Sequence, residues 1–180
     1  MFSLTIATIV LFAVSSISHA GKCPTVPTQK DFDASKYLGL WYEAYRNTII
    51  FELGSKCVNA TYTAKDDGSV GVWNQAINMF GKYSSIKGSA RVKNAMEPAA
   101  LEVKFDNQNQ VGSYNVIATD YENYSLVYSC KNIPVFGKWQ FIWFLSRTKT
   151  LAPSIVDNLN KILSNYGIKS NSISQTHQNC

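Results

Sequence analysis

The chain has 180 residues and a formal net charge of +5, with its lysines and arginines scattered along the sequence. A nucleic-acid-binding surface would require a basic stripe, and the sequence shows none. The four cysteines form no Cys-x-x-Cys pair, and His177 is the only histidine after residue 20, so no metal site is expected.

Residues 1–20 are predicted to be a signal peptide, and residues 21–180 the mature domain. The segment contains no Lys, Arg, Asp or Glu, and Leu4–Val14 is an apolar run of signal-peptide length. Ser18–Ala20 resembles a small-x-small cleavage site. The run is shorter than the ~18 residues that a membrane-spanning helix needs. We therefore expect a secreted, extracellular protein.

An even number of cysteines in an oxidising compartment predicts two disulfides. Four cysteines allow three pairings, and their spacing does not choose between them. With every thiol paired, no cysteine nucleophile remains, and we predict no enzymatic activity. The sequons at Asn59 and Asn123 predict glycosylation at surface positions. The cysteines are Cys23, Cys57, Cys130 and Cys180.

Short β-rich runs separated by turn residues fill the chain from residue 38 to residue 147. Many strands at regular spacing with turn signals indicate an all-β barrel or sandwich. The expected strands cover residues 39–47, 58–64, 69–78, 83–92, 99–105, 112–119, 125–131 and 139–147.

The pattern becomes helical after the last strand. Between Pro153 and Tyr166 the apolar residues fall on one stripe of an amphipathic helix. Pro153 suits the first turn and Gly167 suits the C-terminal stop. A single helix after eight strands packs most simply on the outside of the β unit.

The expected strand at residues 139–147 is apolar on both faces. Because side chains alternate along a strand, Trp139, Phe141 and Trp143 share one face, and Ile142 and Phe144 share the other. A strand that is apolar on both sides is covered on both sides. The helix can cover one face. The other faces either a second sheet or a barrel interior that is filled or holds one small ligand.

Three short motifs resemble those of the lipocalins. They are Gly39-Leu40-Trp41-Tyr42 near the first strand, Thr119-Asp120-Tyr121 in the middle, and Arg147 at the end of the last strand. The segments EPAALEVKF, ATDYENYSLVYSC and FIWFLSR are similar to the branch that contains apolipoprotein D and the insect bilin-binding proteins. The resemblance covers residues 23–180.

The resemblance implies an eight-stranded antiparallel up-and-down β-barrel, closed at one end and open at the other, with the C-terminal helix outside. It also implies disulfides from Cys23 to Cys130 and from Cys57 to Cys180. In this family the motif tryptophan plugs the closed end and the arginine lies across it as a cation–π contact. Structural roles are thus implied for Gly39, Trp41, Thr119, Asp120, Tyr121 and Arg147.

The resemblance and the alternation of side chains together predict a ligand pocket. Trp139, Phe141, Trp143 and Tyr114 supply its aromatic wall. Asn74, Ser129 and Lys131 supply polar anchors. The remaining lining residues are Val72, Ala76 and, by parity with Trp41, Tyr45.

The predicted function is secreted transport of one small hydrophobic ligand inside the barrel. The first candidate implied by the resemblance is biliverdin, a tetrapyrrole pigment bound non-covalently. Lys131 near the mouth suits a carboxylate, such as that of a bilin or a fatty acid. A steroid, a retinoid or a fatty acid is the alternative. A further alternative is a protein- or lipoprotein-interacting lipocalin without a dedicated ligand. The apolar loop Ile133–Phe136 is expected at the open end, either as a lid or as a contact to a membrane, a lipoprotein or a partner.

Overall fold

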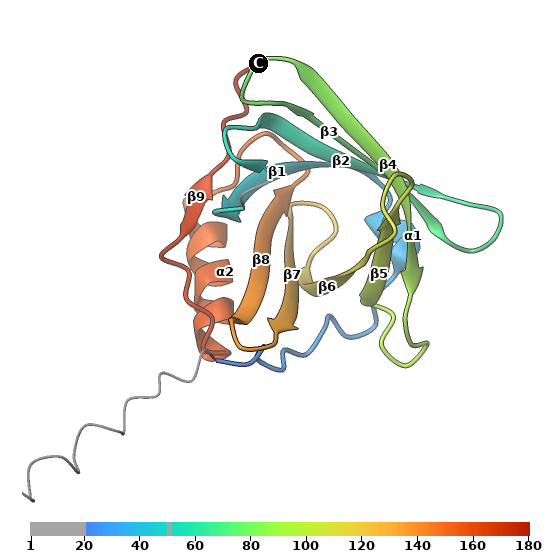
Figure 1. The fold of residues 1–180 in the computed structure, drawn as a ribbon, viewed down its shortest axis with the longest axis vertical. Coiled ribbons are helices and arrows are strands. Elements are labelled where there is room, and N and C mark those ends of the chain that lie inside the picture. Colours follow the sequence, from blue (N-terminus) through green and yellow to red (C-terminus); the bar gives the residue numbers. More distant parts are fainter. Residues whose placement is uncertain (1–20, 50–51) are drawn as a thin grey trace, which may run out of the picture.

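The computed structural model describes residues 21–49 and 52–180, so the predicted signal peptide lies outside the described residues. Eight antiparallel strands form a closed barrel, as predicted (Figure 1). The predicted limits of every strand lie within two residues of those observed. The strands are β1 (Gly39–Asn47), β2 (Lys56–Ala64), β3 (Val70–Ile77), β4 (Tyr83–Val92), β5 (Ala100–Phe105), β6 (Val111–Thr119), β7 (Tyr124–Ile133) and β8 (Gly137–Ser146).

The barrel closes at β1, which pairs with β8 along one edge and with β2 along the other. Pairing with β2 covers only Gly39–Tyr42. Beyond that point the second edge of β1 pairs with β9 (Ile173–Gln175), a three-residue strand that the sequence did not predict. The backbone amide of Cys57 in β2 donates to the carbonyl of His177 at 2.8 Å. The C-terminal segment therefore fills the seam between β1 and β2.

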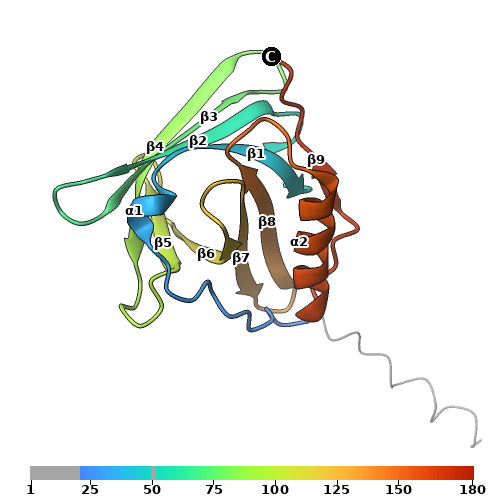
Figure 2. The same cartoon turned by 180° about the vertical axis from the view of Figure 1, so that it is seen from behind.

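The predicted helix is α2 (Pro153–Asn165), which lies outside the barrel against β8 (Figure 2). Leu159 and Leu163 are fully buried and pack in one cluster with Ile142 and Phe144, the outward-facing apolar residues of β8. A second helix, α1 (Ala34–Tyr37), is a single turn that Asp33 caps, and it is too short to produce a periodic signal.

The closed end is held by Arg147 and Trp41. The guanidinium carbon lies 3.8 Å from the centre of the indole ring, which is fully buried. Arg147 also donates to the carbonyl oxygens of Tyr121, Leu40 and Lys36 at 2.9, 2.8 and 3.0 Å. Gly39 has a φ angle of +93°, a backbone conformation that residues other than glycine rarely adopt. The motif residues thus form one structural unit.

Thr119 and Asp120 shape the turn that precedes β7. The Thr119 hydroxyl donates to the carbonyl of Tyr124 at 2.7 Å. One carboxylate oxygen of Asp120 accepts the backbone amides of residues 122, 123 and 124. This turn places the Tyr121 carbonyl where Arg147 binds it.

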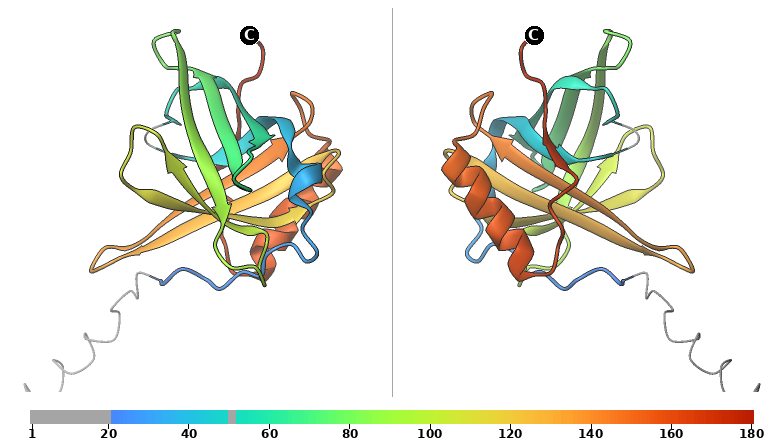
Figure 3. Two further views of the ribbon diagram at one scale, coloured as in Figure 1. Left: turned by 90° about the vertical axis from the view of Figure 1, so that its right-hand side faces the viewer. Right: turned by 90° about the vertical axis from the view of Figure 1, so that its left-hand side faces the viewer.

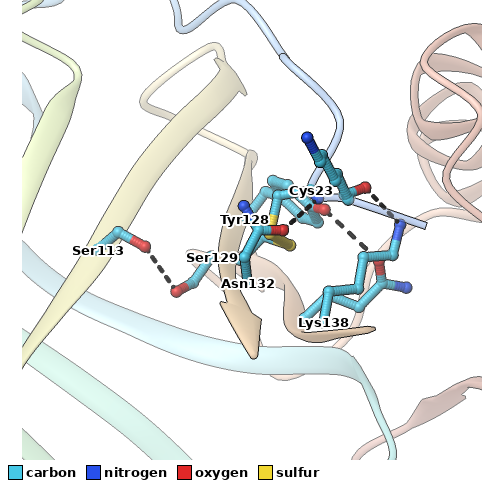
Figure 4. The surroundings of a disulfide bond; sticks show 9 residues. Cys23, Ser113, Tyr128, Ser129, Asn132 and Lys138 are labelled. Atoms are coloured by element: carbon cyan, nitrogen blue, oxygen red, sulfur yellow. Dashed lines mark hydrogen bonds between the residues drawn. A yellow bond between two sulfur atoms is a disulfide. The ribbon is translucent and has the colours of Figure 1, made fainter. Parts of the chain in front are cut away.

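Two disulfides tie the ends of the chain to the barrel, with the same pairs that the resemblance implied. Cys23 joins Cys130 of β7, where the Cys23 amide also donates to the Asn132 side chain at 2.8 Å (Figure 4). Cys180 joins Cys57 of β2. The second bridge fixes the segment that fills the seam.

Because neighbouring strands are antiparallel, the connections after β1, β3, β5 and β7 lie at one end of the barrel. The Trp41–Arg147 pair lies at the opposite end, beside α1. In the left panel of Figure 3 the β7–β8 hairpin, in orange, projects away from α1, in blue. The hairpin therefore marks the open end.

Candidate functional site

The interior of the barrel is filled at the closed end and accessible at the open end. Along the inward face of β8, Leu145 is 6% exposed, Trp143 and Phe141 are half-buried, and Trp139 is 62% exposed. Val72, a predicted lining residue, lies in the filled half, where it packs in the core with Trp41. The accessible half is the candidate ligand pocket.

Aromatic and polar side chains line this half. The rings of Phe141 and Trp143 are stacked, with centroids 5.9 Å apart. Asn74 and Ala76 of β3 are half-buried, in alternation with the inward-facing Val72. The Asn74 side-chain oxygen is buried and has no hydrogen-bond partner among the described residues.

The other predicted polar anchors are differently placed. The Ser129 hydroxyl shares a 2.9 Å hydrogen bond with Ser113, so a protein group already occupies it (Figure 4). Lys131 is exposed and pairs across the ladder with Trp139, at the rim. Of the three predicted anchors, Asn74 is the one with a buried side-chain atom that lacks a hydrogen-bond partner among the described residues.

The prediction that Tyr45 faces the pocket is wrong. Its ring lies 5.9 Å from that of Phe144, in the outer cluster beneath α2. A β-bulge shifts the register of β1 between Glu43 and Tyr45, so Ala44 and Tyr45 both face outward. The same bulge pairs Arg46 with the inward-facing Trp143.

Tyr114 belongs to a row of hydroxyl groups at the floor of the pocket. Its hydroxyl shares 2.9 Å hydrogen bonds with those of Tyr62 and Tyr37, and Tyr37 continues to Ser125 at 2.8 Å. Burial raises the pKa of Tyr62 to about 12 and that of Tyr37 further, so these hydroxyls stay neutral. A cavity of about 20 Å³ beside them has room for one water.

Glu43, Arg46 and Glu52 form a buried ion cluster that the sequence did not predict. Glu43, which is 3% exposed, pairs with the Arg46 guanidinium and accepts a 2.6 Å hydrogen bond from the Thr176 hydroxyl. Glu52, on the connection after β1, places a carboxylate oxygen 3.7 Å from Arg46. Arg46 also donates to the carbonyls of Glu52 and Ser55.

Both carboxyl groups of this cluster are harder to ionise than usual. Burial is the main cause, and it raises the pKa of Glu43 and brings that of Glu52 to about 7. Repulsion from Glu43 raises the pKa of Glu52 further, while the positive charge of Arg46 opposes the change. Arg46 pairs with Trp143 in the ladder between β1 and β8, so the cluster lies beside the aromatic residues of β8.

The open end presents exposed apolar side chains on three separate connections. Val135 and Phe136, between β7 and β8, are 95% and 83% exposed. Met79 and Phe80, between β3 and β4, and Leu53, before β2, are also exposed. In the described part of the chain, no group of three or more His, Cys, Asp or Glu side chains could hold a metal ion.

This barrel, plugged at one end by a Trp–Arg pair and with half-buried aromatic side chains inside its other half, has the architecture of a class of ligand-binding proteins. The chain belongs to the lipocalin family: the lipocalin-like domain matches residues 32–178. Lipocalins are carriers of small hydrophobic ligands.

Full-length relatives are similar along the whole chain. Apolipoprotein D of the mouse, Mus musculus, is 39% identical over 181 residues, which is 100% of this chain and 95% of the relative. Apolipoprotein D of cattle, Bos taurus, is 42% identical over 163 residues, 90% of this chain and 86% of the relative. The Lazarillo protein of Schistocerca americana is 28% identical over 181 residues, which is 99% of this chain and 85% of the relative.

Solved structures share the barrel. Insecticyanin of the tobacco hornworm Manduca sexta superposes with a TM-score of 0.77 at 26% identity, over 87% of this chain and 86% of that one. Lobster apocrustacyanin A1 superposes with a TM-score of 0.78 at 23% identity, over 89% of this chain and 90% of that one. Because the identity to apocrustacyanin A1 is so low, this similarity concerns the fold alone.

Proposed function

We propose that this lipocalin is a secreted, non-enzymatic carrier that holds one small, mostly apolar ligand in the open half of its barrel. The observation that carries the proposal is the stacked, half-buried Phe141–Trp143 pair on the inward face of β8, together with half-buried Asn74 on β3, whose buried side-chain oxygen has no hydrogen-bond partner among the described residues. Burying apolar ligand surface against the rings supplies affinity at roughly 25 cal/mol per Å². A ligand donor that reaches Asn74 satisfies a buried acceptor.

Two disulfides support an extracellular location, because such bonds persist in oxidising compartments. The predicted leader at residues 1–20 agrees with this proposal. Glycosylation at Asn123 belongs to it as well, since that side chain is exposed in the turn before β7. Asn59, which is half-buried in β2, is the less accessible sequon.

Among the ligand candidates, we favour a steroid, a retinoid or a fatty acid over biliverdin. The relatives with about 40% identity carry the name apolipoprotein D, and that branch of the resemblance implies transport of such lipids. Lys131 is exposed at the rim, where it suits the carboxylate of a bilin and that of a fatty acid equally.

Retinol, progesterone and biliverdin titrated into the purified protein test the proposal. We expect at least one to bind, and we expect Trp143→Ala to weaken that binding about thirtyfold, as loss of a buried aromatic anchor does. Retinol fluorescence and equilibrium dialysis report binding without relying on protein tryptophan.

Trp73→Ala is the matched control, because Trp73 lies on β3 with its ring beneath the Lys87 amine, 5.4 Å away, and outside the pocket. Equal losses in both variants would contradict the placement of the site. Failure of all three probes to bind the unmodified protein would overturn the carrier function. Binding of biliverdin alone, with a visible absorption band, would restore the pigment interpretation.

A second candidate function is contact with a lipid surface through the open end. Val135 and Phe136 are too exposed to be packed as a lid over the pocket, and Met79, Phe80 and Leu53 extend the apolar surface. Exposed apolar groups gathered on one face mark interaction sites. In the described residues, no helix is long and apolar enough to cross a membrane.

Phe136→Ser combined with Phe80→Ser is expected to lower binding to lipid vesicles at least tenfold. Retinol affinity should stay unchanged, because both phenylalanine rings lie outside the pocket. Vesicle flotation measures the first quantity. Met96→Ser is the control, since Met96 is 89% exposed on the β4–β5 connection at the closed end. A parallel loss of retinol affinity would instead support the lid.

A further inference from the structure

We propose that Asn59 carries an N-linked glycan whose innermost sugar packs on the indole ring of Trp73, on the outer face of the barrel. The sequon predicts the attachment of a sugar, and the packing site is what the structure adds. The inference rests on the secretion that belongs to the proposed function, because N-linked glycans are added in the secretory pathway. Neither the lipocalin motifs nor the comparisons assign a role to this outer face.

The two acceptor residues of the sequon share the outer face of β2. Ala60 packs against the inner core, so its neighbours on the strand, Asn59 and Thr61, point outward. The Asn59 side chain donates one amide hydrogen to the carbonyl of Cys57 at 3.2 Å. An N-linked sugar replaces only one of the two amide hydrogens of asparagine, and the other remains free to make this hydrogen bond. The folded strand is therefore compatible with a sugar on Asn59.

Trp73 is the diagonal neighbour of Asn59 across the sheet. The ladder between β2 and β3 pairs Asn59 with Gln75 and Thr61 with Trp73. Diagonal neighbours lie about 7–8 Å apart, a distance that a sugar ring on an asparagine amide spans. The Gln75 side chain donates to the hydroxyl of Tyr83 on β4 at 3.1 Å, so it is directed away from β2. The sugar on Asn59 thus has a direct route to the indole.

The indole ring of Trp73 is available for this contact. Trp73 is 38% exposed, and the amine of Lys87 lies 5.4 Å from the centre of its ring. Lys87 belongs to β4, which lies on the side of β3 opposite to β2 (Figure 1). The carbon-bound hydrogens of a sugar carry partial positive charge and pack on the electron-rich face of an indole. A sugar that approaches from β2 therefore meets an exposed aromatic ring.

The glycan would also cover exposed apolar side chains. Leu40 of β1, which is 40% exposed, pairs with Thr61 on the side away from Trp73, so the three residues form one row across the sheet. Exposed apolar groups gathered on one face promote association. An N-linked glycan is bulky and hydrophilic. We therefore expect the sugar on Asn59 to keep this face free of other protein chains.

An Asn123→Gln chain tests the inference, because Asn59 is then the only sequon in the sequence. The chain is secreted from cultured cells that attach high-mannose glycans, and endoglycosidase H trims each glycan to one sugar. The same chain made in the bacterial periplasm carries none. We expect mass spectrometry to find the sugar on Asn59 in most molecules. Tm should be about 3 °C higher with the sugar, the shift that one added aromatic contact gives in a chain of this size.

Trp73→Ala in the same chain separates packing on the indole from any other effect of the sugar. The gain in Tm from the sugar should fall below about 1 °C, because the two partners are coupled only while both are present. In the NMR spectrum, the acetyl methyl signal of the sugar should lie upfield of its usual position and return to it in Trp73→Ala. The cause is the shielding of protons that lie over an aromatic ring.

An Asn59→Gln chain is the matched control, since its remaining sugar is on Asn123, in the turn before β7. The effect of that sugar on Tm should be the same with Trp73 and with Trp73→Ala. Equal gains from the Asn59 sugar with and without Trp73, or an acetyl signal at its usual position, would overturn the packing.

The remaining outcomes separate this inference from the proposed function. A secreted protein without a sugar on Asn59 would overturn the inference and leave secretion standing. A chain that is not secreted would contradict both. A glycosylated protein that is a dimer by size-exclusion chromatography, and a monomer in Trp73→Ala, would make this face an interface between copies and overturn the inference. Loss or retention of retinol binding concerns the carrier function alone, because Trp73 lies outside the pocket.

Discussion

Replacing Trp41 with alanine is expected to lower the free energy of unfolding by about 3–5 kcal/mol, the usual cost of truncating a buried aromatic residue. The side chain is fully buried, donates to the Tyr37 carbonyl at 2.8 Å and lies under the Arg147 guanidinium. Its loss leaves both a cavity and a cation without its aromatic partner. Urea unfolding followed by circular dichroism measures the change.

Leu40→Ala is the control for this prediction, because Leu40 is the preceding residue in β1 and is 40% exposed. We expect it to cost less than about 1 kcal/mol, as surface substitutions do. A Trp41→Ala variant within 1 kcal/mol of the unmodified protein would show that the closed end does not depend on the plug. Retinol affinity should be retained wherever Trp41→Ala still folds, since the plug lies at the end opposite the pocket.

Removing the Cys57–Cys180 disulfide by the double change Cys57→Ser and Cys180→Ser is expected to cost about 4–5 kcal/mol. The bridge closes a loop of 123 residues, and loop-closure entropy gives a value near 4.7 kcal/mol for about 100 residues. Thermal unfolding measures the loss.

The Cys23–Cys130 bridge offers an internal comparison, because its sequence separation of 107 residues predicts a nearly equal entropic cost. The two variants should differ in hydrogen exchange. Only loss of the Cys57–Cys180 bridge should expose the amides of Arg46 and Thr176, which lie along the seam that β9 fills. Equal protection of these amides in both variants would contradict the role of the bridge in closing the barrel.

The strands could be predicted from the sequence because alternation and turn residues are local signals. The faces of β8 were correct for the same reason: Trp143 is inward and Phe144 outward. Tyr45 was misplaced because a bulge changes the register without a sequence marker. β9 was missed because its three residues form a strand only by pairing with the edge of β1.

The site was predictable only in part. Aromatic wall residues could be assigned from the parity of one strand, whereas Ser129 could not be recognised as paired, because its partner Ser113 lies on another strand. The cluster of Glu43, Arg46 and Glu52 had no motif to identify it. Glu43 shares the parity of Trp41, but Arg46 faces inward only because of the bulge, and Glu52 lies on a connection.

The seam between β1 and β2 has a consequence for how the protein is synthesised. β1 is among the first elements to leave the ribosome, yet three of its nine residues find their partner on the second edge only in residues 173–175, more than a hundred residues later. Until then the strand has unpaired backbone groups, which invite association with other chains. Nascent chains should therefore depend on chaperones until β9 is translated, and truncation before residue 173 should yield aggregates rather than a smaller barrel.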